Sequence, residues 1–390
     1  MTIISLQSLL LGYNLIITGI IAALLGISIY NLLRFARLPP AMVRATGPSV
    51  SILVPARNEE RCIEACVRSV CEQSYDKTDV YVLNDGSTDQ TAPILDRLRK
   101  EFGHLHVING APLPEDWVGK SWACHQLSEV AKGEILIFTD ADTVHQTDMV
   151  SRSLLFIEQN DVAFFSLIPY QELGTMGENI VIPMIHFLYF AYLPNDLILH
   201  NRSVSIAAAN GQFMCFTRPG YDKVGGHRSV KGSLVEDVFL AKATKRAGLR
   251  IALVDGTDVV SCRMYTSASE VTKGFSKNFF PATNYNLPLT VLFLFHLTSA
   301  YIIPIPMVVL GMTLGQPRII FMAALQLIMS GIIRLLISFR FAMPWWHVFL
   351  QPLTGIWSVI IGINSIRWAF SKRGAQWKGR HYATRGTTNA

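Results

Sequence analysis

Two carboxylates, one residue apart, follow an apolar run in the segment EILIFTDADTVH. Ile135 to Phe138 predict a short buried strand, so Asp140 and Asp142 stand at its end. Ionised carboxylates are costly to bury without a partner. Hard oxygen ligands this close together suit Mg²⁺ or Mn²⁺, which proteins usually bind through one or two carboxylates plus substrate phosphates. The pair therefore predicts a divalent metal ion, the alternative being a solvated loop.

Polar side chains also follow two earlier predicted strands. The segment VPARNEE closes a strand over residues 49–56, and LNDGSTD closes another over 79–85. Asp85 can accept the N–H of a pyrimidine ring, and Asn58 or Glu59 can bond a ribose hydroxyl. The alternatives are structural, with Asn58 capping a helix and Asp85 closing a turn. The candidates for a nucleotide pocket in these loops are Pro55, Arg57, Asn58, Glu59 and Asp85.

Lys120 precedes a predicted helix in the segment EDWVGKSWA. A lysine near a helix N-terminus suits a phosphate, although it can also be a solvated charge. The segment is not a P-loop, because Pro114 stands where the GxxxxGK[ST] pattern requires glycine. We therefore predict that Lys120 lies near the phosphates of a nucleotide.

An acidic pair, Glu236 and Asp237, begins a later predicted helix, VEDVFLAKATKRAG. Carboxylates there can complement the helix dipole, which contributes roughly 0.3–1 kcal/mol. Alternatively, one of them can be the general base for an alcohol. An amide at the same position would cap the helix without supplying a base, so substitution separates these two interpretations.

The C-terminal half supplies further candidates for substrate contacts. Arg263 can clamp a diphosphate or anchor the chain at a membrane interface. Trp377 and Arg380, in the segment WKGRHY, can belong to an aromatic belt or contact the acceptor. Gln212 and Glu236 are the remaining secondary candidates for the acceptor site.

These clusters need a scaffold that brings strand ends together. Apolar runs at 49–56, 79–85, 105–110 and 134–140 are separated by segments with apolar residues at helical spacing. Strands that alternate with helices predict a parallel sheet covered on both faces, whose ligands lie beyond the carboxyl ends of the strands. The predicted fold class is therefore α/β with a mostly parallel sheet.

Apolar segments flank this domain. Residues 5–33 carry no charge and exceed the roughly 20 residues needed to cross a bilayer, which predicts a transmembrane anchor. Arg34, Arg37 and Arg44 follow it and, by the positive-inside rule, place the next domain in the cytoplasm of a protein integral to the cell membrane. The predicted organisation is an anchor and linker (1–47), a cytosolic catalytic domain (48–285), a membrane block of two to three helices (286–370) and a basic tail (371–390).

The C-terminal block poses a topological conflict. Three full crossings would translocate the tail, yet its lysines and arginines should stay in the cytoplasm. We therefore predict that one segment is re-entrant or interfacial, and that it is 287–315, which contains Pro304 and Pro306. The alternative is a translocated tail.

The composition of the 390 residues fits this organisation. Half of them are hydrophobic and only 16% are charged, which is more apolar than an ordinary soluble enzyme. The net charge of +6 is better explained by anionic lipid headgroups and an anionic substrate than by nucleic acid. Six cysteines without CxxC spacing predict buried thiols in a cytosolic domain.

The segments VPARNE, NDGSTD, GK, DAD and ED occur in the order and approximate spacing of family 2 glycosyltransferases. The chain resembles that family over about residues 48–285, which implies a GT-A (nucleotide-diphospho-sugar transferase) fold. The RMY and KGF segments, the apolar block and WKGRHY are similar to a narrower membrane group. That group contains hopanoid-associated and carotenoid-acid glycosyltransferases and is similar to ceramide glucosyltransferase.

The resemblance implies a role for each matching residue. Asn58, Glu59 and Asp85 would contact the nucleoside of a UDP-sugar, with Lys120 near the nucleotide. Asp140 and Asp142 would bind the nucleotide-sugar and the metal, Asp142 more directly. Arg263 would contact the diphosphate. Asp237 would be the base of the transfer step.

The sequence departs from the family pattern at two places, which limits the roles that the resemblance implies. No QxxRW follows the acidic pair at the usual distance, and the nearest segment is NSIRW at 364–368, far downstream. This argues against a cellulose-like polymer synthase. Asn84 stands where the family often has aspartate, so only Asp85 is carried over.

These observations predict a metal-dependent inverting glycosyltransferase that moves a single sugar from a UDP-sugar to a membrane lipid. The alternatives are a short-chain polysaccharide synthase of the same fold and a non-catalytic membrane scaffold.

Overall fold

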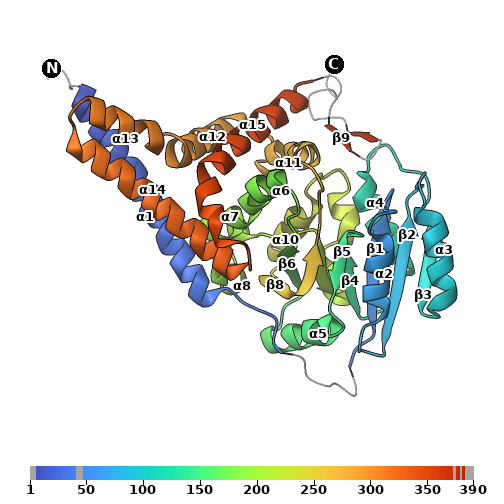
Figure 1. Ribbon diagram of the computed structural model, residues 1–390. Helices are drawn as coiled ribbons and strands as arrows, with labels where there is room; N and C mark the ends of the chain where they lie inside the picture. Colours follow the sequence, from blue (N-terminus) through green and yellow to red (C-terminus); the bar gives the residue numbers. More distant parts are fainter. Residues whose placement is uncertain (1–5, 41–46, 372–374, 378–379, 383–390) are drawn as a thin grey trace. The chain divides into compact units, whose positions relative to one another are not determined.

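The computed structural model describes residues 6–40 and 47–371, together with the backbone of 375–377 and 380–382 (Figure 1). Its contacts divide the chain into two compact units, which we describe separately. The sheet unit comprises residues 35–172 and 195–264. The helical unit comprises residues 1–34, 173–194 and 265–390.

The sheet unit is built on eight strands in the order β3-β2-β1-β4-β7-β6-β8-β5. The strands are β1 (Val50–Ala56), β2 (Thr78–Asn84), β3 (Leu105–Asn109), β4 (Ile135–Thr139), β5 (Thr143–His145), β6 (Phe164–Gln171), β7 (Phe213–Thr217) and β8 (Ile251–Cys262). Its principal helices are α2 (Ile63–Cys71), α3 (Thr91–Glu101), α4 (Gly119–Val130), α5 (Met149–Asn160), α8 (Asp196–His200), α9 (Arg218–Lys223) and α10 (Glu236–Arg246).

The first half of the sheet has the predicted parallel arrangement. Strand β1 pairs in parallel with both β2 and β4, and β2 pairs in parallel with β3. The second half differs, because β7 runs antiparallel to β4 and β6, and β5 runs antiparallel to β8. The sheet is therefore mixed, which refines the predicted mostly parallel sheet. The strand–helix alternation that indicated parallel pairing ends after β4.

Both faces of the sheet are covered. Along β1, Val50, Ile52 and Val54 belong to one core cluster with apolar residues of α2, α3 and α5. Side chains of successive strand residues point to opposite faces, so the buried Leu53 faces away from this cluster. The buried helix face predicted for 63–70 is confirmed in α2, where Ile63, Cys66, Val67 and Val70 are buried.

The six cysteines are all free, and five of them are buried. Burial raises the pKa of the Cys66 and Cys124 thiols, which keeps them protonated and unreactive. The predicted reduced thiols are thus confirmed.

The helical unit contains the apolar segments. Its helices are α1 (Leu6–Arg34), α6 (Met176–Val181), α7 (Pro183–Ala191), α11 (Ala268–Ala282), α12 (Leu287–Tyr301), α13 (Pro304–Thr313), α14 (Pro317–Arg340) and α15 (Gln351–Ala369). Within the part of the chain that the structure describes, three helical segments are long and apolar enough to cross a membrane: Ser8–Arg34, Pro317–Arg340 and Trp345–Ala369.

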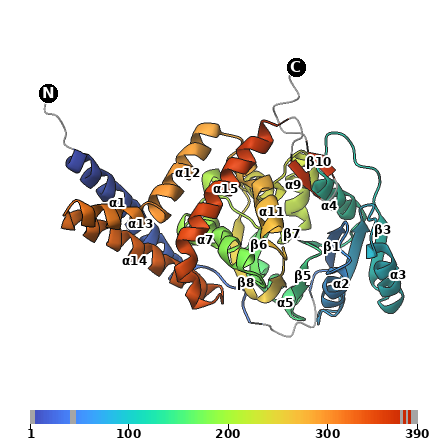
Figure 2. The ribbon, with the colours of Figure 1, turned by 45° about the horizontal axis from the view of Figure 1, so that its top comes forward.

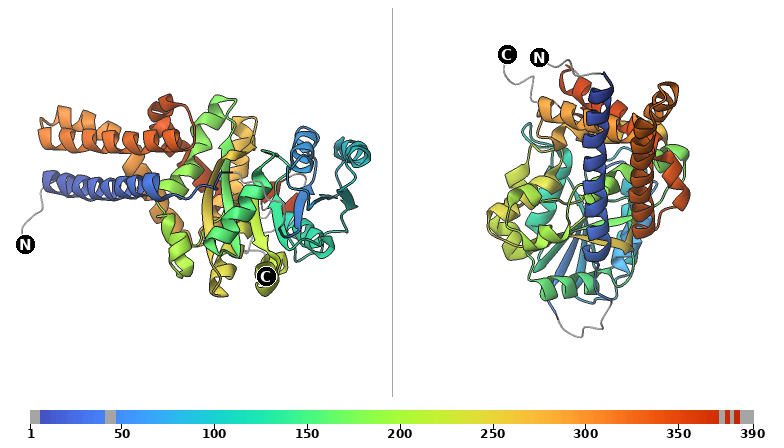
Figure 3. Two further views of the ribbon diagram at one scale, coloured as in Figure 1. Left: turned by 90° about the horizontal axis from the view of Figure 1, so that it is seen from below. Right: turned by 90° about the vertical axis from the view of Figure 1, so that its left-hand side faces the viewer.

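The helices α1 and α14 run side by side within this unit (Figure 3). Gln326 on α14 joins them, because its Nε2 donates to the Asn14 carbonyl at 3.1 Å and contacts the Thr18 hydroxyl at 3.0 Å. Such polar contacts between apolar helices satisfy groups that lipid cannot.

The predicted break at Pro304 is present. Helices α12 and α13 meet at an angle of 53° across it, as a broken span or a re-entrant loop (Figure 2). Proline at the start of α13 lacks the N–H that would continue the α12 hydrogen-bond ladder. The side of the membrane on which the tail lies stays a prediction.

The contact grouping differs from the contiguous segments 48–285 and 286–370 predicted from the sequence. Residues 173–194 and 265–285 group with the apolar helices. One reason is the side chain of Asn31 in α1, whose Nδ2 donates to the Phe190 carbonyl at 2.8 Å. Of the predicted tail, Trp377 and Arg380 lie in the paired strands β9 (Ala375–Trp377) and β10 (Arg380–Tyr382), and their side chains lie outside the described part.

We expect Gly133→Ala to destabilise the sheet unit. A Cβ on Gly133 would lie 2.5 Å from the Ser51 backbone nitrogen, at the point where the chain enters β4 beside β1. Relieving that overlap requires a backbone shift, which we expect to lower the free energy of unfolding by about 1–3 kcal/mol. The measurement is thermal or chemical unfolding of the purified chain in detergent. Gly103→Ala is the matched control, since its Cβ would meet nothing within 4 Å. Equal effects of the two substitutions would contradict the steric argument.

Candidate active site

Many of the candidate residues lie at the carboxyl ends of the parallel strands β1, β2 and β4. In the parallel strands β1, β2 and β4, Ala56 lies beside Asn84, so the loops that leave these strands emerge together. Strand β7 runs the opposite way and begins with Phe213 beside Thr139, so the residues before β7 meet those after β4. The register of the sheet thus brings together segments near positions 57, 85, 140 and 211.

Lys120 is the centre of the site. It is the second residue of α4, and its Nζ lies 2.6 Å from Oδ1 of Asp140 and 3.1 Å from Oε1 of Glu236. The same ammonium donates to the Gly211 carbonyl at 3.1 Å. Burial alone would lower the pKa of Lys120, but the two carboxylates raise it well above its usual value. The lysine is therefore a permanent cation that joins three loops.

Glu236 and Asp237 open helix α10 and have opposite electrostatic behaviour. Burial alone would raise the pKa of Glu236, but the Lys120 ammonium outweighs burial and lowers it. Burial raises the pKa of Asp237 to about 7, and the charge of Glu236 adds to that rise. One carboxylate is thus a fixed anion, whereas the other exchanges its proton near neutral pH, as a general base requires.

Gly211 is a site residue that the sequence analysis did not identify. A Cβ at this position would lie 3.1 Å from the Lys120 Nζ and 3.4 Å from Oδ2 of Asp237. The absence of a side chain therefore lets the lysine and the two carboxylates of α10 approach one another. The sequence feature that could have indicated Gly211 is its position directly before Gln212, which is itself a candidate site residue.

Gln212 is a buried residue that contacts the backbone of the site. It is 4% exposed, its Oε1 accepts from the side-chain amides of Gln171 and Asn210, and its Nε2 lies 2.8 Å from the Cys262 sulfur. Its backbone carbonyl accepts from the backbone N–H of Asp140 at 3.2 Å. These contacts use the side-chain amide internally and hold the Asp140 turn, which favours positioning over the acceptor contact predicted for Gln212.

A buried polar network holds the DAD turn in place. The Thr143 hydroxyl donates to the Asp140 carbonyl at 2.7 Å, and the Thr139 hydroxyl donates to the Gln212 carbonyl at 2.9 Å. The Thr139 oxygen also lies 3.0 Å from Nε2 of His145. Burial lowers the pKa of His145 to about 3, so this ring is neutral and brings no charge beneath the carboxylates.

The loops after β1 and β2 are joined to each other. The Asn58 Oδ1 accepts from the backbone N–H of Thr88 at 2.8 Å, and Arg57 donates to the Asp85 carbonyl at 2.5 Å. Asn58 adopts a left-handed backbone conformation, with φ of 53°. It does not cap a helix, since α2 begins five residues later at Ile63.

The turn after β2 also differs from the structural alternative. Asn84 closes it, because its Oδ1 accepts from the Ser87 N–H at 3.1 Å. Asp85, the next residue, is buried at the end of the strand.

The remaining candidates lie at the margins. Pro55 lies within β1 beside Leu83, and the Glu59 backbone N–H donates to the Thr91 hydroxyl at 2.8 Å. Arg263 is exposed and lies one residue past the Thr143–Cys262 pair, which places its backbone next to the DAD turn.

The donor set fits a divalent cation. Asp140 and Glu236 both meet the Lys120 ammonium, and the charge of Glu236 adds to the effect of burial in raising the pKa of Asp237. Asp142 and Asp140 lie near Cys262, whose pKa is raised by burial and by both of their charges. Within the described residues, no group of three or more His, Cys, Asp and Glu side chains is arranged to hold a metal by itself. Asp140 and Asp142 would therefore share the ion with phosphate oxygens, as is usual for Mg²⁺.

Comparison with known proteins identifies relatives of this chain. Residues 51–224 match the sequence profile of glycosyl transferase family 2. The chain is 25% identical over 236 residues to the 4,4'-diaponeurosporenoate glycosyltransferase of Staphylococcus haemolyticus, covering 60% of this chain and 61% of that protein. The Staphylococcus aureus enzyme of the same name is 26% identical over 238 residues, covering 59% and 60%. The chain thus spans about three-fifths of the length of these relatives.

The fold has a solved counterpart. The mannosyltransferase PcManGT from Pyrobaculum calidifontis, in complex with GDP-Man and Mn2+, has a TM-score of 0.52 at 18% identity. The alignment covers 92% of this chain and all of that one. The GT-A fold predicted from the sequence is thereby confirmed, and residues 51–224 of this chain match the model of glycosyl transferase family 2.

Proposed function

We propose that the protein is a metal-dependent, inverting glycosyltransferase that moves one sugar from a nucleotide sugar to a membrane lipid. The observation that carries this proposal is the cluster in which Lys120 lies between Asp140 and Glu236, with Asp237 beside them. The cluster places a cation and metal-type ligands next to a group that can take a proton near neutral pH.

The loops after β1 and β2 would hold the nucleoside. Asp85 lies buried where a pyrimidine ring N–H could be accepted, and Asn58 and Arg57 stiffen the loop around it. UDP is the donor that this chemistry favours. The structural relative was solved with GDP-Man, so a binding assay should include both nucleotides.

The transfer would be a single displacement at the anomeric carbon. A divalent ion at Asp140 and Asp142 would supply charge neutralisation on the departing diphosphate. The Lys120 ammonium, held by Glu236, adds a fixed positive charge at the same place. Asp237 accepts the proton of the acceptor hydroxyl as the new bond forms to the sugar, so no covalent glycosyl-enzyme is required.

The acceptor is proposed to be a lipid of the carotenoid-acid type or a similar membrane amphiphile. Two observations support this: the three helical segments that are apolar enough to cross a membrane, and the diaponeurosporenoate glycosyltransferases among the relatives. A carboxylate acceptor is already ionised and would depend less on Asp237 than a hydroxyl would.

We expect Asp237→Asn to lower the transfer rate to a hydroxyl acceptor at least about 100-fold, because an amide cannot accept the proton. Nucleotide binding should persist. The measurement is product formation from labelled nucleotide sugar, with nucleotide affinity measured in parallel. Asp222→Asn, an exposed aspartate on α9, is the matched control. Retained turnover to a hydroxyl acceptor would disprove the base assignment. If the variant still transfers sugar to a carboxylate acceptor but not to a hydroxyl acceptor, the base is needed only for hydroxyl acceptors.

The acidic limb of the pH–rate profile should report Asp237. Its pKa of about 7 means that activity falls as the pH drops below that value, because the base becomes protonated. Glu236→Gln removes a negative neighbour, so we expect this limb to move to lower pH. Glu129→Gln on α4, whose carboxylate is exposed, should leave the limb in place. The idea fails if the two variants have the same profile.

Removal of divalent ions should stop transfer, and Mn²⁺ or Mg²⁺ should restore it. Asp142→Asn should raise the metal concentration needed for half-maximal activity, since the ion loses a charged ligand. Titration of metal against the donor-bound protein gives this value. Full activity in the presence of a chelator would exclude metal dependence, and sizing of the product would exclude a polysaccharide synthase if only one sugar is added.

A further inference from the structure

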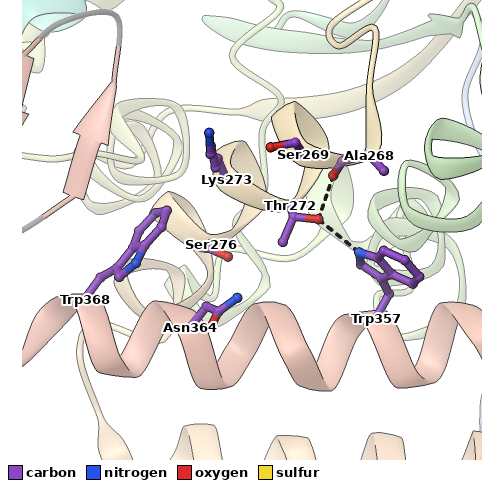
Figure 4. A pocket seen from close by; sticks show the side chains of 8 residues that line it. All are labelled: Ala268, Ser269, Thr272, Lys273, Ser276, Trp357, Asn364 and Trp368. Carbon is purple, nitrogen blue, oxygen red and sulfur yellow. Dashed lines mark hydrogen bonds between the residues drawn. The ribbon is translucent and has the colours of Figure 1, made fainter.

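The helical unit contains a pocket of about 410 Å³ between α11 and α15 (Figure 4). Both helices belong to this unit, and α15 lies in a segment that is apolar enough to cross a membrane. The lining residues are Ala268, Ser269, Thr272, Lys273, Ser276, Trp357, Asn364 and Trp368. None of these is acidic.

Hydrogen-bond donors dominate the pocket. The exposed Lys273 ammonium has no carboxylate partner among the described residues, and the Asn364 amide has no recorded bond there either. Ala268 and Ser269 form the first turn of α11, whose helix dipole favours negative charge. The nearby carboxylate of Glu270 is directed to the Thr266 N–H and hydroxyl, both at 3.0 Å, and does not line the pocket.

Ser276 is an independent indication of a ligand. The residue is 1% exposed and lines the pocket, and its hydroxyl has no hydrogen-bond partner within the described part of the chain. A buried polar group left unsatisfied is unfavourable. By contrast, Thr272 one turn earlier is satisfied, since it accepts from the Trp357 indole N–H at 2.9 Å and donates to the Ala268 carbonyl at 2.7 Å.

The character of the lining selects the ligand. A site rich in donors and without carboxylates suits a group rich in acceptor oxygens, whereas it suits neither a metal ion nor a cationic head. The two tryptophans are typical of the membrane–water interface. Helix α15 also exposes Leu353, Ile356, Ile360 and Ile363, which suits contact with acyl chains.

We propose that the α11–α15 pocket binds the oxyanion head, phosphate or carboxylate, of a membrane lipid. Lys273 and the first turn of α11 supply the positive potential, and Ser276 and Asn364 donate hydrogen bonds. The apolar tail lies along α15. This inference does not rest on the proposed transfer reaction, because binding requires no nucleotide sugar.

The test is binding of dioctanoyl phosphatidic acid to the full-length chain, purified and delipidated in neutral detergent. Dioctanoyl phosphatidylcholine and inorganic phosphate are the comparison probes. We expect Lys273→Gln to weaken binding of phosphatidic acid about tenfold, as for loss of a charge-assisted hydrogen bond. Ser276→Ala should weaken it several-fold with an unchanged melting temperature. Lys277→Gln removes the same charge from the same helix without touching the lining and should stay within about twofold of the parent chain.

Equal affinities of the Lys273→Gln and Lys277→Gln variants would overturn the proposal, and so would equal binding of phosphatidic acid and phosphatidylcholine. Binding of inorganic phosphate as tight as that of phosphatidic acid would refute the lipid assignment. Two supporting outcomes separate the sources of the head group. Competition between phosphatidic acid and the acceptor in the transfer assay identifies the pocket as an acceptor site, whereas a change in rate without competition identifies a bulk anionic lipid.

Discussion

The position of the Lys120 ammonium between Asp140 and Glu236 is the interaction on which the remainder of the active site depends. Two like charges about 4 Å apart repel by on the order of 4 kcal/mol at an effective dielectric constant of 20. One shared cation offsets that repulsion and joins the loop after β4 to the start of α10. Because its partners come from three loops, the lysine fixes their mutual distance as well as their charge.

The other features of the site follow from this constraint. The ammonium and the carboxylates of α10 lie close to Gly211, since a Cβ there would be 3.1 Å from the Lys120 Nζ and 3.4 Å from Oδ2 of Asp237. Asp237 cannot share Lys120 to the same degree as Glu236, so its pKa rises while that of Glu236 falls. The adjacent carboxylates thereby differ, because the pKa of Glu236 is lowered whereas that of Asp237 is raised to about 7. Beneath them, neutral His145 and the threonine hydroxyls hold the DAD turn without adding charge.

The helical unit has a different constraint, which is the hydrogen bonding of polar groups among apolar helices. Its apolar helices must satisfy polar groups without water, as Gln326 does between α1 and α14. In the pocket of α11 and α15, the Ser276 hydroxyl and the Lys273 ammonium are among the polar groups without an internal partner in the described residues. An amphiphile with an oxyanion head would satisfy both groups.

Local patterns in the sequence determined much of this protein. Apolar runs and helical spacing identified β1 to β4 and the buried face of α2, because each element carries its own periodicity. Lys120, Asp140, Asp142, Glu236 and Asp237 could be predicted as site residues because strand ends and helix starts are where such side chains can meet a ligand. The long apolar segments likewise predicted the apolar helices, and Pro304 predicted the break between α12 and α13.

Tertiary structure decided what depends on contacts between distant segments. The antiparallel insertion of β7 beside β4 brings Gly211 and Gln212 to Asp140, and no local pattern encodes that pairing. Gln212 was predicted to face the acceptor, yet its amide is used within the fold. Lys120 pairs with Glu236, which lies 116 residues further along the chain. This tertiary contact leaves Asp237 as the carboxylate whose pKa lies near 7. The sequence supplied the charged groups, whereas only their three-dimensional spacing set which of them is neutralised and which can accept a proton.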